Sequence, residues 1–182
     1  DVNGQRDVDS EGNFLPMALA QQAVESHISS ANWSQYDLDS DGWVDRLLIL
    51  HTTKGQEENT GSSDRIWSHY TTFKEPIIIS DDLRVGHYTM SSLKTGSSGV
   101  GTMLHEMLHQ MGALDLYPVH DTFQTHQWKG VGDWDIMASG NWNGGGSWPA
   151  LPSAASLELI GAERQQVMDL QWPSSAISPC IG

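Results

Sequence analysis

The stretch His105-Glu-Met-Leu-His109-Gln-Met-Gly112-Ala-Leu-Asp115 decides how this chain is interpreted. Side chains four residues apart lie on one face of a helix, so His105 and His109 can present two imidazole nitrogens to one ion. Glu106 is rotated from them by about a third of a turn, which suits a base beside the ion better than a third ligand. Gly112 is expected to end the helix, because it tolerates a left-handed backbone, and the turn there returns Asp115 toward the same ion.

These residues predict a catalytic zinc site with His105, His109 and Asp115 as ligands. Three protein ligands plus one water are the open coordination of a catalytic zinc, whereas a structural zinc has four protein ligands. Zinc lowers the pKa of a bound water to about 7. Glu106 can accept the proton of that water and pass it to a leaving amine. The sequence therefore indicates hydrolysis of peptide bonds with Glu106 as the general base.

The composition is that of a globular protein and excludes several functions. The chain has 182 residues, which fits one domain over residues 1–182. Nine Lys and Arg against 23 Asp and Glu give a net charge of −14, so the clustered cations of a nucleic-acid binder are missing. No apolar run approaches the roughly 18 residues that a membrane span needs. Cys180 is the only cysteine, so no internal disulfide can form, and nothing in the sequence indicates an oligomeric state.

Strands and helices alternate early in the chain and helices dominate late, which predicts an α/β or α+β domain. Strands are expected at residues 46–52, 66–69, 76–80 and 85–90. Helices are expected at residues 16–29, at residues 100–111, and from about residue 152 to beyond residue 159. In the first helix, the residues expected to face inward are Leu19, Ala23 and Ile28.

The zinc stretch and a second segment, Val131-Gly-Asp-Trp-Asp-Ile-Met137-Ala-Ser-Gly140, together resemble the metzincin clan of zinc peptidases. In that clan the pattern HExxHxxGxx with a third ligand is followed by a tight turn that carries a methionine beneath the zinc. More narrowly, the chain is similar to the bacterial immune inhibitor A-like peptidases, the M6 family. The segments that match, in the family's order, are residues 36–45, 66–69, 105–117 and 132–140.

The resemblance implies a metzincin-like catalytic domain, with a twisted mixed sheet, an active-site helix, a methionine turn with Met137 under the metal, and a C-terminal helix. It also implies a secreted endopeptidase that acts on proteins or peptides and is often made with a propeptide and C-terminal domains. Because the sequence starts at Asp1 without a signal peptide, we expect that such segments have been removed. Ser139 stands where some metzincins have a Tyr that assists the oxyanion. Tyr117 is a candidate substitute, although a structural role is the preferred interpretation.

The acidic loop Asp37-Leu-Asp39-Ser-Asp41-Gly42-Trp43-Val-Asp45 predicts a calcium site. Its Asp residues stand at positions 1, 3, 5 and 9 of a calcium loop with Gly at position 6, and Trp43 could add a backbone carbonyl. The twelfth position is Leu48, so this is no EF-hand and another segment must complete the shell. Four carboxylates this close repel one another without a cation, which favours calcium over a solvated turn. Residues 7–12 repeat the pattern more weakly.

Two alternatives remain at this point. A thermolysin-like peptidase would take its third ligand from a later helix, as Glu158 or Glu163, although Gly112 and the methionine turn favour Asp115. A catalytically silent binding or adhesion module that depends on calcium would keep the fold without the chemistry. Such a module has no use for a general base. Asp133 and Asp135 are expected to brace the methionine turn through backbone N–H groups.

Overall fold

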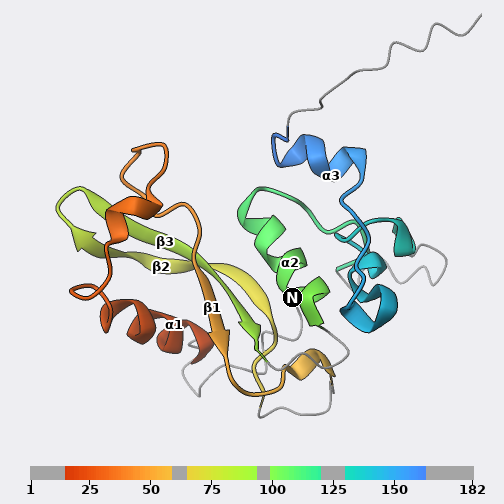
Figure 1. The fold of residues 1–182 in the computed structure, drawn as a ribbon, viewed down its shortest axis with the longest axis horizontal. Helices are drawn as coiled ribbons and strands as arrows, with labels where there is room; N and C mark the ends of the chain where they lie inside the picture. Colours follow the sequence, from red (N-terminus) through yellow and green to blue (C-terminus); the bar gives the residue numbers. More distant parts are fainter. Residues whose placement is uncertain (1–14, 59–64, 94–98, 120–129, 163–182) are drawn as a thin grey trace, which may run out of the picture.

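The computed structural model describes residues 15–58, 65–93, 99–119 and 130–162. One part is built on a sheet and includes α1 (Leu15–Glu25), and a second, loop-rich part ends in α3 (Ala154–Leu159). Helix α2 (Gly99–Gln110) lies between the two parts (Figure 1). None of the helices in these ranges combines the length and the apolar composition needed to cross a membrane. The mixture of strands and helices is the α/β class that the sequence predicts.

The three strands in the described ranges form one mixed sheet in the order β1-β3-β2. Strand β1 (Leu48–His51) runs parallel to the central β3 (Leu83–Ser92), and β2 (His69–Ser80) runs antiparallel to it. The register pairs Leu48 with Thr89 on one side and His69 with Met90 on the other. The prediction of a mixed sheet is therefore confirmed.

The strand boundaries differ from the expected ones in an informative way. The strands expected at 76–80 and 85–90 are parts of the longer hairpin strands β2 and β3, and the strand expected at 46–52 is the shorter β1. A strand at 66–69 is wrong, because only His69 belongs to a strand. The N–H of Ser68 donates to Glu57 Oε2 at 3.2 Å and is thereby engaged outside the ladder.

Helix α1 covers one face of the sheet with residues spaced four apart. Ala20 and Val24 are buried in a core that also contains Tyr88 and Met90 of β3. The expectation that Leu19 faces inward is wrong, since it is 44% exposed and its neighbour Ala20 takes that position. Ile28, beyond the end of the helix, packs against the same core as expected.

Helix α1 also ends earlier than the predicted residue 29, at Glu25. Ser26 Oγ and His27 Nδ1 both donate to the carbonyl oxygen of Ala23. Side chains that bond nearby carbonyls in this way compete with the helical ladder, which accounts for the early end.

Helix α2 lies against the opposite face of β3. Neighbouring residues of a strand point to opposite faces, so Thr89 points to α2 while Tyr88 and Met90 point to α1. Thr89 Oγ1 donates to the carbonyl oxygen of Glu106 at 3.2 Å. All three of these β3 side chains are fully buried, so both faces of β3 are covered.

The Gln110 side chain joins the end of α2 to two strands. Its Oε1 accepts from Leu47 N at 3.2 Å, and its Nε2 donates to Leu47 O at 3.0 Å and to Thr89 Oγ1. A buried amide with every bond made fixes the helix both along and across the sheet. The position of α2 therefore depends on polar contacts as well as on packing.

The loop-rich part packs against the first turns of α2. A Cβ at Gly101 would overlap the carbonyl oxygen of Asn141, so only glycine lets the 3₁₀ segment Ser139–Gly146 approach this closely. The last helix was expected to continue past residue 159, which is wrong. It ends at Leu159, after which Ile160 leaves the helical geometry with ψ of 4° and Gly161 adopts φ of +69°.

We predict that Gln110→Met lowers the free energy of unfolding by about 1–3 kcal/mol, because Leu47 N–H loses its partner while the side-chain volume is kept. Urea unfolding followed by circular dichroism measures this loss. Gln22→Met on the exposed face of α1 is the matched control and should change stability by less than about 0.5 kcal/mol. Equal stabilities for both variants would contradict the role given to Gln110.

Candidate metal centre

Helix α2 carries His105 and His109 on one face, one turn apart, as the spacing predicts. The helix ends at Gln110, and Gly112 adopts φ of +97° two residues later. This left-handed residue reverses the chain, so that Asp115 returns to the two imidazoles. The local sequence alone therefore accounts for the meeting of the three side chains.

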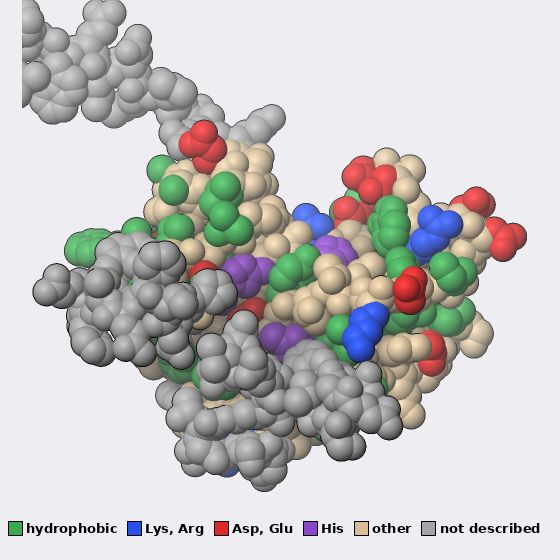
Figure 2. All heavy atoms as spheres, turned by 180° about the vertical axis from the view of Figure 1, so that it is seen from behind, with side chains coloured by type: hydrophobic (Ala, Val, Ile, Leu, Met, Phe, Trp, Pro, Cys, Tyr) green, Lys and Arg blue, Asp and Glu red, His purple; other side chains and the backbone are tan. Residues whose placement is uncertain are grey.

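The three predicted zinc ligands converge closely. His105 Nε2 lies 3.2 Å from His109 Nε2, and Asp115 Oδ1 lies 3.1 Å from the first and 3.3 Å from the second. His105 is only 3% exposed, whereas Asp115 and His109 are partly exposed. The site is thus closed on the helix side and open toward solvent. Figure 2 shows histidine and acidic side chains gathered in the middle of one face, between the α3 side and the sheet side.

The hydrogen bonds of Nδ1 determine the tautomer of each histidine ring. His105 Nδ1 lies 2.8 Å from Ile136 O, and His109 Nδ1 lies 2.9 Å from Ala113 O. A carbonyl oxygen only accepts, so Nδ1 carries the proton and Nε2 of the neutral ring carries a lone pair. Two such lone pairs and a carboxylate oxygen this close repel one another without a cation among them. Two imidazole nitrogens and one carboxylate oxygen are a donor set that zinc accepts, so these residues fit a zinc ion.

The electrostatics of the three groups are strongly coupled. Burial lowers the pKa of His105 and His109, but Asp115, together with Glu106 and a backbone carbonyl at each ring, outweighs it, so both pKa values lie above their usual value. Burial alone would raise the pKa of Asp115, yet the two imidazoles hold it well below its usual range. Protons and a metal ion therefore compete for the same site, and metal binding must release protons.

Glu106 is held by the first residues of β2. Its Oε2 accepts from the backbone N–H of Tyr70 at 2.9 Å. The Tyr70 ring stacks on His109, with ring centres 6.3 Å apart and planes 22° apart. Burial raises the pKa of Glu106 to about 7. Tyr70 thus contacts both the base and a ligand, and sequence reasoning missed it because a backbone N–H carries no residue signal.

Met137 belongs to a small hydrophobic cluster that is separate from the core between α1 and the sheet. Met137 is fully buried with Ala113 and Ile136, and its carbonyl oxygen accepts from Leu116 N at 2.8 Å. This bond ties the turn to the residue that follows Asp115. The structure thus places the predicted methionine turn directly beside the loop of the third ligand.

Asp135 organises this turn, as expected from its position in the sequence. It is fully buried; Oδ1 accepts from Met137 N at 2.7 Å, and Oδ2 accepts from Ser153 N at 2.9 Å and Ser156 Oγ at 2.7 Å. Burial opposes the charged form, but these bonds outweigh it and keep the pKa of Asp135 below its usual value. Asp133, by contrast, is exposed.

The acidic loop brings three of its four predicted carboxylates together. One carboxylate oxygen each from Asp37, Asp39 and Asp45 lies within 4.8 Å of the others. Asp41 is not part of that group, and its Oδ1 accepts from Trp43 N at 2.9 Å. Gly42 adopts φ of +86°, which explains the glycine at the sharp turn. The weaker repeat at residues 7–12 lies outside the described residues.

Other candidate residues lie at varying distances from the centre. The Tyr117 ring centre is 6.3 Å from that of His105, so this residue borders the site. His69 donates through Nδ1 to Trp67 O and accepts from Tyr88 O–H, within the sheet. Glu158 of α3 is exposed and does not belong to the metal-binding group found in the described ranges. Glu163 lies outside them.

Comparisons with known proteins identify a family that this chain resembles. The family described as immune inhibitor A peptidase M6, catalytic domain, matches residues 13–157. Immune inhibitor A of Bacillus thuringiensis subsp. alesti is 28% identical in an alignment of 160 residues that covers 75% of this chain and 23% of that protein. The pre-pro-metalloprotease PrtV of Vibrio cholerae serotype O1 (strain M66-2) is 30% identical in an alignment of 168 residues that covers 79% of this chain and 18% of that protein. The chain thus spans about a fifth of the length of these relatives.

We predict that Asp135→Asn raises the dissociation constant for zinc about 10- to 100-fold, because the turn that presents Ile136 O to His105 loses its anchor. Competition with a chromogenic zinc chelator measures this constant. Asp133→Asn makes the same chemical change on the exposed face and should leave it unchanged. An unaltered constant in Asp135→Asn would contradict the proposed role of Asp135.

The same variant tests the charge of Asp135 through pH. A carboxyl group whose pKa is lowered by folding stabilises the folded state above its unfolded pKa of about 4. We therefore expect wild type to be more stable than Asp135→Asn above pH 4, with the difference shrinking as the pH falls below that value. Urea unfolding of the metal-free proteins between pH 3 and pH 7 gives the difference. A gap independent of pH would contradict this assignment.

Proposed function

Because the chain belongs to the immune inhibitor A peptidase M6 family, we propose that it is a zinc-dependent endopeptidase with Glu106 as its general base. The observation that carries this proposal is the convergence of His105 Nε2, His109 Nε2 and Asp115 Oδ1 within 3.3 Å of one another. The base is the residue next to the first ligand, and Tyr70 N–H holds its carboxylate at 2.9 Å.

The residues of the site divide the proposed reaction between them. A zinc ion held by the three ligands would polarise the scissile carbonyl and acidify the attacking water. Glu106 accepts a proton from that water and delivers it to the leaving nitrogen of the substrate. A pKa of about 7 for Glu106 suits both transfers, and the positive charge of a metal would favour the carboxylate form. The bond from Tyr70 N–H leaves the other carboxylate oxygen for the reaction.

The proposed substrates are proteins or peptides, hydrolysed outside the cell. Both relatives are many times longer than this chain, and the name of PrtV describes a pre-pro-form, which supports a secreted precursor. We propose that residues 1–182 form a single catalytic domain of such a protein. A silent binding module is disfavoured, because such a module would not need a partly buried Glu106 that is aligned by a backbone N–H.

A calcium ion on the acidic loop is the second part of the proposal. The carboxylates of Asp37, Asp39 and Asp45 support it, because three oxygens within 4.8 Å match the spacing of a calcium shell. Asp41 and the carbonyl of Trp43 remain predicted ligands. Val44 N, within the loop, donates to Arg84 O at the start of β3 at 2.9 Å, which supports a structural role for the loop.

We predict that Glu106→Gln lowers the rate of casein hydrolysis at least about a hundredfold while the bound zinc stays at the wild-type level. The assay is run with zinc and calcium supplied, and metal analysis follows the zinc. Glu158→Gln on α3 is the matched control and should keep both activity and zinc, because Asp115 is the third ligand. Equal activity in Glu106→Gln and wild type would contradict the mechanism. A wild type that binds zinc but cleaves nothing would favour the binding module.

Calcium is predicted to raise the thermal midpoint of unfolding by several degrees in a buffer that contains zinc throughout. A ligand at 100 times its dissociation constant contributes about 2.7 kcal/mol, and 1 kcal/mol is worth roughly 2–4 °C in a chain of this size. Asp39→Asn should abolish the rise, whereas the exposed Asp81→Asn should retain it. Midpoints that do not depend on calcium would rule out this site.

A further inference from the structure

A second buried carboxylate lies outside the metal centre. Glu57 belongs to the 3₁₀ turn Gln56–Glu58 and is only 9% exposed. Its Oε2 accepts from Ser68 N at 3.2 Å, and its Oε1 accepts from Ser68 Oγ at 2.6 Å. In the described part of the chain, no Lys or Arg forms a salt bridge with it. A buried carboxylate whose two oxygens both accept hydrogen bonds from one residue restricts that residue strongly, so its position calls for an explanation.

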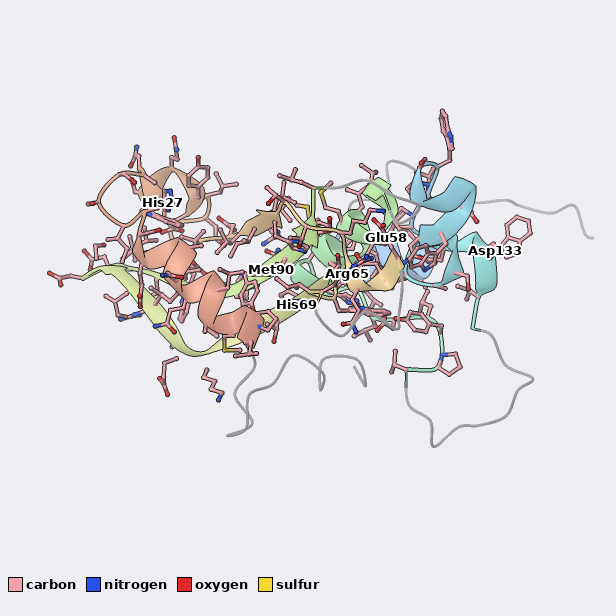
Figure 3. All side chains as sticks on the ribbon, turned by 90° about the horizontal axis from the view of Figure 1, so that it is seen from below. His27, Glu58, Arg65, His69, Met90 and Asp133 are labelled. Carbon is pink, nitrogen blue, oxygen red and sulfur yellow. The ribbon has the colours of Figure 1, made fainter. Side chains whose placement is uncertain are left out.

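The bonds of Glu57 fix the segment that precedes β2. Gln56 N donates to Ile66 O at 2.9 Å, so the turn and the segment run side by side. The Ser68 hydroxyl donates its hydrogen bond to Glu57. Ser68 Oγ therefore acts as the acceptor for the hydroxyl of Ser91 in β3, at 3.1 Å. Figure 3 shows His69 beside Met90 of β3, which is its register partner. Glu57 therefore sets where β2 begins relative to β3.

The next residues of β2 lead to the base. Tyr70 lies two positions after Ser68, and its N–H donates to Glu106 Oε2 at 2.9 Å. We propose that Glu57 is a positioning residue for Glu106, which acts by clamping Ser68 so that the N–H of Tyr70 is held against the Glu106 carboxylate. This inference rests on the proposed function only for its effect on catalysis.

Gly55 gives independent support for the clamp. A Cβ at this position would lie closer to the carboxyl group of Glu57 than van der Waals contact allows. The carboxylate folds back over the glycine to reach Ser68, and a larger residue would push it away. Gly55→Ala therefore removes the clamp without changing any group that takes part in it.

The direct test is hydrogen exchange at the Tyr70 amide, followed by NMR on the ¹⁵N-labelled full chain in the metal-free state. Glu57→Ala, Ser68→Ala and Gly55→Ala are each expected to speed this exchange about tenfold or more relative to wild type. Glu58→Ala changes the neighbouring acid, whose Oε2 pairs with Lys54 at 3.6 Å, and should leave the exchange unchanged. If Glu57→Ala fails to fold, Ser68→Ala and Gly55→Ala decide the matter. Wild-type exchange rates in the folded clamp variants would overturn the proposal.

The catalytic consequence is tested by separating kcat from KM on a peptide substrate with zinc saturating. Glu57→Ala should lower kcat about 10- to 100-fold with KM nearly unchanged, and Glu57→Gln, which keeps one acceptor oxygen, should restore part of the loss. The double variant with Ser68→Ala should be no slower than Glu57→Ala alone, because both act through one contact. Additive losses, or a change in KM alone, would overturn the proposal. If wild type cleaves nothing, the proposed function fails, and the exchange measurement still decides on the clamp.

Discussion

The structure depends on one constraint, which is that three electron-pair donors are held within 3.3 Å of one another. This arrangement is unfavourable unless a cation joins the three donors, so the fold has to hold each of them in place. His105 is oriented by Ile136 O and His109 by Ala113 O, and both carbonyls lie in the chain that follows α2. The loop-rich part therefore orients the two histidines, and the sheet contacts Glu106 through Tyr70.

Two buried carboxylates stabilise the two sides of this arrangement in a similar way. Asp135 anchors the turn whose carbonyl orients His105, and Glu57 anchors the segment whose N–H, two residues on, orients Glu106. Each acts on the backbone rather than on the functional side chain itself. A backbone group held at both ends loses little entropy when the reaction begins, which is the advantage of a site organised in advance.

The sequence predicts the parts of the site that local geometry determines. The spacing of His105 and His109, the glycine at 112 and the return of Asp115 all follow from helix periodicity and one left-handed residue, and the structure brings the three side chains together. The sequence does not predict Tyr70, Glu57 or Gln110, because their roles come from pairings between segments far apart in the chain. The wrong strand at 66–69 has the same origin, since a distant carboxylate occupies the N–H of Ser68. The predicted inward face of α1 differs from the observed one by one residue. Leu19 and Ala20 are both apolar, so only packing in the folded protein decides which of them is buried.

The most direct test of this account is an X-ray crystal structure of the zinc-loaded chain, with anomalous difference maps recorded on both sides of the zinc absorption edge. We predict one strong peak bounded by His105 Nε2, His109 Nε2 and Asp115 Oδ1, at the roughly 2.0–2.2 Å ligand distances of zinc. The peak should vanish below the edge. A peak whose third protein ligand is Glu158 or Glu163, or no peak between the two histidines, would contradict the account.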